Sequence, residues 1–305
     1  MKRVVSVSLG ASKRDHRIEV ELLGEKCLIE RIGTDGDLGR AVALIKKLDG
    51  QVDAFGMGGI DLYVQAGGKR YILREARQLA EAAKVTPILD GTGLKNTLER
   101  KAVLYLDKVY GLKIKGASVL MVCAADRFGM AETFAALGAK LTLGDLIFTI
   151  GLPLPLYSLQ ALGKVAAVLA PIMTQLPIKY LYPTGPDQER TVRRGEQYFR
   201  QNSIIAGDFH IIRRYLPDGL QDKVVVTNTV TESDILWLEQ KGARLLVTTT
   251  PEFAGRSFGT NVMEALLVAL SGQTGSGLSA EQYEVLLDRL DFKPRVVEIG
   301  SPMGS

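Results

Sequence analysis

The chain has 305 residues, of which 46% are hydrophobic and 24% charged, and this composition is that of a globular protein rather than a disordered or fibrous one. Its 38 basic and 34 acidic residues are spread along the chain and give a net charge of +4, so no basic stripe indicates a nucleic-acid partner. Cys27 and Cys123 lie far apart without a CxxC motif, and the N-terminus enters a strand pattern without a signal peptide, which predicts a reduced, cytoplasmic protein.

The first part of the chain predicts hairpins mixed with helices. The expected strands are 3–10, 17–23, 25–32, 52–55, a hairpin over 62–73 around Gly67 and Gly68, and one beginning at Pro87. The expected helices are 37–48, 74–84 and 96–110. We interpret the last helix as a joint between two domains.

The second part alternates strands with helices. The expected strands are 118–123, 140–143, 179–182, 203–206, 223–227 and 244–248, followed by a helix at 280–290. Alternation of this kind predicts right-handed crossovers and a doubly wound parallel sheet. The predicted fold is α/β: a smaller mixed α/β substrate domain (1–112), a Rossmann-like dinucleotide-binding domain (113–272), and a C-terminal helix and tail (273–305).

Residues 146–163 contain no charged side chain over eighteen positions, which is long enough to cross a membrane. Pro153 and Pro155 would break such a helix near its middle, so we expect no membrane partner. We interpret the segment as a buried helix pair, an apolar pocket or a subunit interface, with a homo-oligomer contact through 146–178 as one role.

Residues 119–145 have the pattern of a nucleotide-binding strand, turn, helix and strand. In the best register of GxGxxG the motif positions hold Ala124, Asp126 and Gly129, so only the glycine for close helix packing is present. The hypothesis is that the backbone from Ala124 and Ala125 onward binds a diphosphate, with Arg127 pairing with a phosphate. Asp126 would repel the diphosphate unless it turns away or caps the helix.

Asp145 lies 19 residues beyond Asp126, close to the spacing of the acid that hydrogen-bonds an adenosine ribose. A carboxylate there would favour NAD over NADP. The alternative is a doubly wound domain that has lost nucleotide binding, with Asp126 as a helix cap and Asp145 as a solvated loop residue.

Polar residues follow several predicted strands, where the carboxyl ends of a parallel sheet border a ligand crevice. These residues are Gly207, Asp208, Asn228, Thr229, Thr249 and Thr250. We expect Asn228 and Thr249 to contact the cofactor, and we interpret Asp208 and Thr231 as helix caps.

Four further features are candidates for substrate chemistry. His16 lies in a charged loop and Arg256 precedes a helix, so either could bind an anionic substrate. Asn261, three residues before Glu264, has the spacing of a capping box. Lys95 and Asp90 flank a glycine-containing turn and could exchange a proton with a substrate hydroxyl, or could be surface charges beside a helix cap at Asn96. No metal-binding motif is present.

Four segments of the sequence carry a resemblance to a known family. They are Val5-Ser-Val-Ser-Leu-Gly, Asp90-Gly-Thr-Gly-Leu-Lys-Asn-Thr, Asp126-Arg-Phe-Gly and Thr248-Thr-Thr-Pro with the following Gly-Arg-Ser-Phe-Gly-Thr-Asn. Together they resemble bacterial proteins labelled quinate 5-dehydrogenase, distantly similar to shikimate and quinate dehydrogenases. The resemblance implies an N-terminal substrate domain, an NAD(P)-binding domain and a lysine–aspartate pair in the cleft between them. It implies that Ser6 and Ser8 hold the substrate carboxylate and that Lys95 and Asp90 are the catalytic pair.

Three hypotheses follow from these observations. The first is an NAD- or NADP-dependent oxidoreductase that transfers hydride to or from a small hydroxylated acid. The second is a non-catalytic nucleotide- or metabolite-binding protein, which the missing glycines favour. The third is a reductase of a long apolar substrate held against residues 146–163.

Overall fold

The computed structural model describes residues 1–66, 69–176, 192–250, 252–253, 256–273 and 277–299. The described residues form two compact units, each of which contains a largely parallel sheet. The first unit takes its residues from Met1–Thr97, Val168–Gln188 and Phe258–Phe292, and the second from Leu98–Ala167, Glu189–Ser257 and Lys293–Ser305. The chain therefore passes between the units several times.

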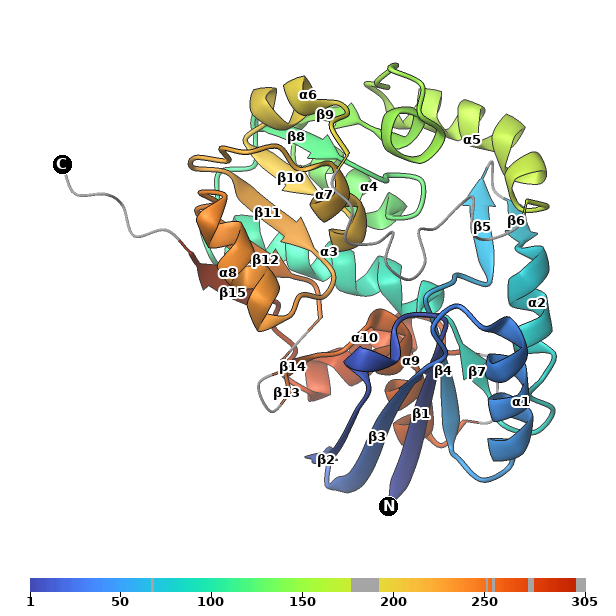
Figure 1. The fold of residues 1–305 in the computed structure, drawn as a ribbon. Helices are drawn as coiled ribbons and strands as arrows, with labels where there is room; N and C mark the ends of the chain where they lie inside the picture. Colours follow the sequence, from blue (N-terminus) through green and yellow to red (C-terminus); the bar gives the residue numbers. More distant parts are fainter. Residues whose placement is uncertain (67–68, 177–191, 251, 254–255, 274–276, 300–305) are drawn as a thin grey trace. The chain divides into compact units, whose positions relative to one another are not determined.

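The first unit is built on a five-stranded sheet with β1 at its centre (Figure 1). The strand order is β2 (His16–Leu22), β3 (Glu25–Gly33), β1 (Lys2–Ser8), β4 (Ala54–Gly58) and β7 (Ile88–Leu89). β2 is antiparallel to β3, and the remaining neighbours are parallel. A short 3-10 helix (Ser12–Arg14) precedes β2, and β5 (Tyr63–Ala66) and β6 (Lys69–Ile72) form a separate antiparallel pair.

Alternate residues of β1 face different helices. Val5 and Val7 pack into a core with residues of α1 (Leu38–Leu48) and α2 (Arg74–Ala80). On the opposite face, α9 (Thr260–Ser271) lies along β1 and β4 (Figure 1). Ser6 on this second face accepts a hydrogen bond from Asn261 of α9. The polar positions of β1 therefore lie on the α9 side of the sheet.

The second unit has a six-stranded doubly wound sheet. Its order is β15 (Arg295–Glu298), β12 (Leu245–Thr248), β11 (Val224–Thr227), β10 (Ile204–Ala206), β8 (Ser118–Met121) and β9 (Lys140–Leu143). All neighbours are parallel except β15, which is antiparallel to β12. The order reverses at β8, as in Rossmann-like sheets.

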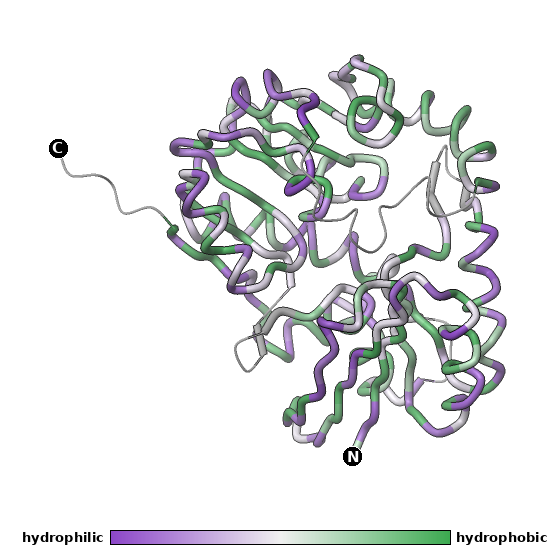
Figure 2. The backbone as a smooth tube through the Cα atoms, viewed as in Figure 1, coloured by the Kyte–Doolittle hydropathy of each residue, from purple (hydrophilic) through white to green (hydrophobic). Residues whose placement is uncertain are grey.

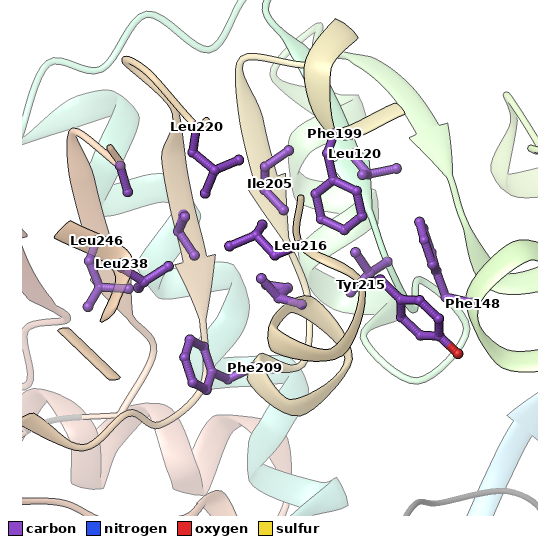
Figure 3. Packing of buried hydrophobic residues seen from close by; sticks show 14 of the residues in the cluster. Leu120, Phe148, Phe199, Ile205, Phe209, Tyr215, Leu216, Leu220, Leu238 and Leu246 are labelled. Carbon is purple, nitrogen blue, oxygen red and sulfur yellow. The ribbon is translucent and has the colours of Figure 1, made fainter. Parts of the chain in front are cut away.

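The inner strands of the second unit, β8, β10, β11 and β12, are buried on both faces, which explains their hydrophobic sequences (Figure 2). One face packs against α3 (Thr92–Lys108) and α4 (Phe128–Ala136). The other packs against α6 (Glu196–Gln201), α7 (Phe209–Tyr215) and α8 (Glu232–Gln240), with Phe199, Phe209 and Leu238 in the cluster (Figure 3). The remaining elements are a π-helix (Leu146–Ile150), α5 (Leu159–Met173), α10 (Ala280–Arg289) and the pair β13 (Glu252–Phe253) and β14 (Arg256–Ser257).

The α/β fold class, with a doubly wound sheet and a mixed α/β N-terminal part, is confirmed. The strand predicted at 179–182 lies outside the described residues. α3 begins at Thr92, four residues before the predicted start at Asn96, because the Asp90 carboxylate accepts hydrogen bonds from the Thr92 amide and hydroxyl. The predicted boundaries at 112 and 272 differ from the two units, since α9 and α10 belong with the first sheet.

The uncharged stretch at residues 146–163 contains the π-helix and the first five residues of α5. Within the described part of the chain, no helix combines the length and the apolar character needed to span a membrane. Several large apolar side chains between residues 146 and 176 are exposed: Leu152, Leu154, Tyr157, Val168, Ile172 and Leu176. The homo-oligomer contact through 146–178 stays a prediction.

Gly91 tests how tightly α9 packs against the turn before α3. Gly91 has φ +94°, and a Cβ built on it would lie 2.7 Å from the Asn261 backbone nitrogen. We expect Gly91→Ala to lower the free energy of unfolding by roughly 2 kcal/mol more than the backbone strain alone, because the α9 backbone must move. The matched control is Gly36→Ala in the same unit, at φ +86° with open space around it, which should cost about 1 kcal/mol. Equal losses in urea unfolding of both variants would contradict this packing.

Candidate functional site

The carboxyl edge of the first sheet gathers a set of polar and titratable side chains. β1, β4 and β7 run parallel and end at this edge. The residues that follow them, and those of α9 and α10 that face them, include Ser8, Asp61, Asp90, Lys95, Glu264 and Tyr283. Titratable groups that share a buried location are candidates for function.

Lys95 lies in the first turns of α3 and is 7% exposed. Its Nζ lies 3.4 Å and 3.5 Å from the two carboxylate oxygens of Asp61, in the loop after β4. The sequence predicted Asp90 as the partner, and the structure gives Lys95 an ion pair with Asp61 instead. Asp90 accepts hydrogen bonds from the Leu62 amide at 2.6 Å and from Thr92, so its carboxylate fixes the turn. A catalytic role for Lys95 or Asp90 stays a prediction.

Glu264 is a buried carboxylate on α9, 3% exposed. Its Oε2 accepts a hydrogen bond from the Gly91 amide at 2.7 Å, and its Oε1 accepts one from the Tyr283 hydroxyl at 2.6 Å. Burial raises the pKa of Glu264 to about 7, against the lowering effect of these two hydrogen bonds. Burial and the neighbouring Glu264 carboxylate also raise the pKa of Tyr283.

The capping box predicted for Asn261 and Glu264 is wrong, because Gly259 is the N-cap of α9. Both side chains reach other elements instead: Asn261 donates to Ser6 and Glu264 accepts from Gly91. Asn261 and Glu264 reach these partners because α9 packs against β1 and β4 of the first sheet. A sequence signal for Glu264 exists, since it is the one charged residue in the largely apolar helix Thr260–Ser271.

Ser6 and Ser8 are both nearly fully buried, 1% and 5% exposed. The Ser6 hydroxyl oxygen accepts from Asn261 Nδ2 at 2.9 Å. The Ser8 hydroxyl oxygen accepts from the Gly10 amide and from Arg31 Nη2, both at 3.1 Å. Because these oxygens act as acceptors, each hydroxyl keeps its proton to donate, and among the described residues no acceptor for either proton is found.

His16 and Arg31 lie near the same edge on neighbouring strands. The ring of His16 contacts Phe258 with centroids 5.3 Å apart, and its Nδ1 lies 3.0 Å from the Arg14 carbonyl oxygen. Its Nε2 is buried and has no hydrogen-bond partner among the described residues. Burial lowers the pKa of Arg31, while its ion pair with Asp15 acts in the opposite direction. Arg256 lies in β14 and pairs with Phe253 of β13. The structure describes its backbone and not its side chain.

The turn after β8 in the second unit is filled by protein groups. Asp145 Oδ2 accepts from the Ala124 amide at 3.1 Å, and Oδ1 accepts from the Ala125 amide at 2.8 Å. Burial raises the pKa of Asp145 to about 6. Asp145, which was predicted to bind the ribose, therefore lies beside the turn. Its carboxylate oxygens accept hydrogen bonds from the two amides that were predicted to face a diphosphate.

Arg127 is also engaged within the protein. Its guanidinium is 3% exposed and forms ion pairs with Glu99 and with Asp208 at 2.9 Å, and Asp126 lies 3.8 Å from Nε. Burial opposes the charge of Arg127, but these carboxylates outweigh it and raise its pKa. The residue predicted to bind a phosphate is thus surrounded by acids.

The other predicted cofactor residues lie at this edge of the second sheet. Asn228 Nδ2 donates to Asp208 at 2.9 Å, and its Oδ1 accepts from the Phe209 amide. Thr249 is buried, and its hydroxyl has no partner among the residues described. Gly129 is buried in α4, where its carbonyl accepts from the Thr133 hydroxyl. The N-cap of α4 is Arg127 rather than Asp126, whereas Asp208 and Thr231 cap α7 and α8 as predicted.

A dinucleotide does not fit this turn as the structure presents it. A diphosphate needs backbone amides or cationic groups with hydrogen bonds left to give. Here the Ala124 and Ala125 amides bind Asp145, and Arg127 binds Glu99 and Asp208. With Asp126 added, three carboxylates surround the Arg127 guanidinium, so a diphosphate would be repelled. We therefore derive no hydride-transfer step through NAD or NADP.

The fold and the two sets of polar residues define the class of protein: an α/β protein with a Rossmann-like second unit and a buried polar edge in the first. The chain belongs to the family described as "Domain of unknown function (DUF8754)", whose model matches residues 93–299. Residues 3–90 match a second family model, "Domain of unknown function (DUF8753)". The matched ranges meet at the turn before α3. Among curated proteins, none matches this sequence.

Solved structures with a similar arrangement include both enzymes and binding proteins. Shikimate dehydrogenase from Aquifex aeolicus has 13% identity and a TM-score of 0.36, covering 94% of this chain and 97% of that one. A glucose-galactose binding protein from Geobacillus stearothermophilus has 10% identity and a TM-score of 0.37, covering 98% and 97%. L-tryptophan dehydrogenase from Nostoc punctiforme has 12% identity and a TM-score of 0.35, covering 88% and 68%. Similarity at this level does not distinguish an enzyme from a binding protein.

Replacement of Arg127 by methionine tests the acidic cluster. Because Arg127→Met removes the cation paired with buried Glu99 and partly buried Asp208, we expect a loss of roughly 3–5 kcal/mol in the free energy of unfolding. The control is Arg100→Met. The side chains of Arg100 and its ion-pair partner Glu132 are 41% and 47% exposed, so we expect a loss of at most about 1 kcal/mol. Fluorescence of the single tryptophan, Trp237, reports the unfolding of the second unit. A cost for Arg127→Met no larger than that of the control would refute the cluster.

The raised pKa of Asp145 leads us to expect a pH dependence of the free energy of unfolding. Its pKa is raised in the folded chain from 3.8 to about 6, so its protonated form stabilises the fold, and this contribution disappears as the pH rises from about 4 to 6. A shift of this size corresponds to roughly 2–3 kcal/mol. In Asp145→Asn, denaturant unfolding between pH 4 and 6 should lack this decline. The quantity to compare is the difference between variant and wild type, because Glu264 adds its own decline to both. A difference that stays constant with pH would contradict the raised pKa.

Proposed function

We propose that the chain is an enzyme, an oxidoreductase by its resemblance, that binds a small hydroxylated carboxylic acid of the quinate or shikimate class in its first unit. In this proposal Ser6 and Ser8 donate hydrogen bonds to the acid's carboxylate. Lys95, held in place by Asp61, exchanges a proton with one of its hydroxyls. The observation that carries the proposal is the buried Lys95–Asp61 pair, at the sheet edge where β1 also ends.

The hydrogen bonds of the serines support the carboxylate part of the proposal. Ser6 and Ser8 lie two residues apart on one face of β1, and each hydroxyl proton remains to be donated. Two such donors suit an anion with two oxygens. Arg31 donates to the Ser8 hydroxyl oxygen, but its charge is already paired with Asp15, so the support for an acid comes from the two serine hydroxyls.

The ion pair supports the proton-exchange part. The side chains of Lys95 and Asp61 are 8% and 18% exposed, so bulk water does not dominate their surroundings. A substrate hydroxyl near Lys95 Nζ would give its proton to the neutral amine, and in the reverse direction it would receive a proton from the ammonium. Asp61 would hold the ammonium in place. The resemblance implies NAD or NADP as the cofactor, with NAD as the predicted preference. The turn after β8 does not fit a dinucleotide, so no hydride-transfer step is derived through either one.

A second candidate is a non-catalytic metabolite-binding protein. The specific observation in its favour is the turn after β8, in which Asp145 and the partners of Arg127 take the groups that a dinucleotide would need. In this case the first unit would still bind the acid. Lys95 and Asp61 would then contribute charge and position without proton transfer.

Ligand binding by calorimetry tests the proposed acid site. We expect quinate or shikimate to bind the wild type, and Ser8→Ala to weaken binding by about tenfold to a hundredfold, because a hydrogen bond to a charged group is lost. Ser233→Ala, at an exposed serine of the second unit, is the control and should have no effect. An affinity for the acid that is equal in Ser8→Ala and wild type would rule out the carboxylate site.

Cofactor binding then separates the two candidates. Binding of NAD, NADH, NADP or NADPH to the wild type would support the oxidoreductase. Turnover of the acid with that cofactor should fall by roughly a hundredfold or more in Lys95→Met, since a general base contributes at least this much. Failure of all four cofactors to bind, with the acid still bound, would favour the binding protein.

A further inference from the structure

Glu264 connects the last helices of the first unit to the turn that carries Lys95. The Tyr283 hydroxyl of α10 donates to Glu264 Oε1, and the Leu278 amide donates to the same hydroxyl at 3.2 Å. The Gly91 amide donates to Glu264 Oε2. One carboxylate therefore ties three separate parts of the chain together.

The glycines of the Asp90-Gly-Thr-Gly turn leave room for α9 and the Glu264 side chain to lie close to the turn. A Cβ on Gly93 would collide with Glu264 Oε1 and would lie 3.4 Å from the Tyr283 hydroxyl. A Cβ on Gly91 would collide with the backbone of α9 at Asn261. Both glycines are thus explained by the close approach of α9 and its glutamate, which differs from the phosphate-binding use of glycine-rich turns.

Gly91 connects Glu264 to Lys95 through two hydrogen bonds of its backbone. Its amide is held by Glu264, and its carbonyl oxygen accepts the Lys95 amide at 2.8 Å in the first turn of α3. Lys95 in turn forms the ion pair with Asp61. The path from Tyr283 through Glu264 and Gly91 to Lys95 lies wholly within the first unit.

The charged and titratable groups that face Glu264 come from three elements. Asp90, after β7, raises the pKa of Glu264, whereas Lys95 on α3 and the hydrogen bond from Tyr283 on α10 lower it. Tyr63 of β5 contributes a small further rise to the pKa of Tyr283. Since Lys95 affects the ionisation of Glu264, Glu264 affects the ionisation of Lys95 to the same extent.

We propose that Glu264 is a positioning residue for Lys95, which holds the turn at Gly91 in place and adds a negative charge to the surroundings of the Lys95 ammonium. This inference rests on the proposed function in one respect, namely that Lys95 exchanges a proton with the substrate. When Glu264 is ionised, it stabilises the ammonium and makes Lys95 a stronger base. When Glu264 is protonated, Lys95 gives up its proton more readily.

NMR titration of the full chain without substrate tests the proposal. The Lys95 ¹³Cε signal is assigned by its loss in Lys95→Arg and followed from pH 5 to pH 11. In the wild type we expect an inflection near pH 7, where Glu264 ionises, in addition to the lysine's own titration. In Glu264→Gln this inflection should disappear, and the midpoint of the Lys95 titration should move to lower pH.

Two further variants keep the test decisive if Glu264→Gln does not fold. Tyr283→Phe removes a hydrogen bond that lowers the pKa of Glu264, so the inflection in the Lys95 signal should move to higher pH. Glu284→Gln, at an exposed glutamate of α10, should leave the signal unchanged. Absence of the inflection in the wild type, or an inflection that neither Glu264→Gln nor Tyr283→Phe changes, would overturn the proposal.

The outcome is distinguishable from failure of the proposed function. The titration contains no ligand, so it reports the coupling of Glu264 to Lys95 whether or not quinate or shikimate binds. If the coupling is observed and the acid does not bind, the positioning contact stands and the substrate class is wrong. If the acid binds and the coupling is missing, the site stands without Glu264.

Discussion

The hydrogen bond between the Gly91 amide and the Glu264 carboxylate is the constraint on which the first unit depends. The two residues are 173 positions apart in the sequence, so the sheet edge is complete only after the chain has built most of the second unit and returned. A carboxylate buried at this depth is costly unless its oxygens are hydrogen-bonded, and Glu264 meets this requirement with Gly91 and Tyr283. The first unit therefore includes α9 and α10 as well as the N-terminal strands.

The sequence predicted the second unit well and the first unit's site poorly, for physical reasons. Strands such as β11 and β12 are buried on both faces, so their apolar runs are visible without knowledge of their neighbours. The caps at Asp208 and Thr231 are local contacts over two or three residues and were also predictable. Local chemistry of this kind is carried by the sequence alone.

The partners of Lys95 and Glu264 depend on long-range packing. Asp61 meets Lys95 because β4 and β7 are parallel neighbours, and no local pattern indicates which acid lies at that edge. The early start of α3 likewise depends on tertiary contacts, since Gly93 disfavours a helix by its intrinsic propensity. Asn261 and Glu264 had the spacing of a capping box, but their hydrogen bonds go to Ser6 and Gly91.

Both units have a parallel sheet with polar residues at its carboxyl edge, yet their hydrogen-bonding capacity differs. In the second unit, the amides of Ala124 and Ala125 and the guanidinium of Arg127 already have carboxylate partners. In the first unit, the hydroxyls of Ser6 and Ser8 accept hydrogen bonds and still have protons to donate. A fold alone does not specify a ligand. Because an anion binds where donors remain, this difference favours the first unit as the place where an acid is recognised.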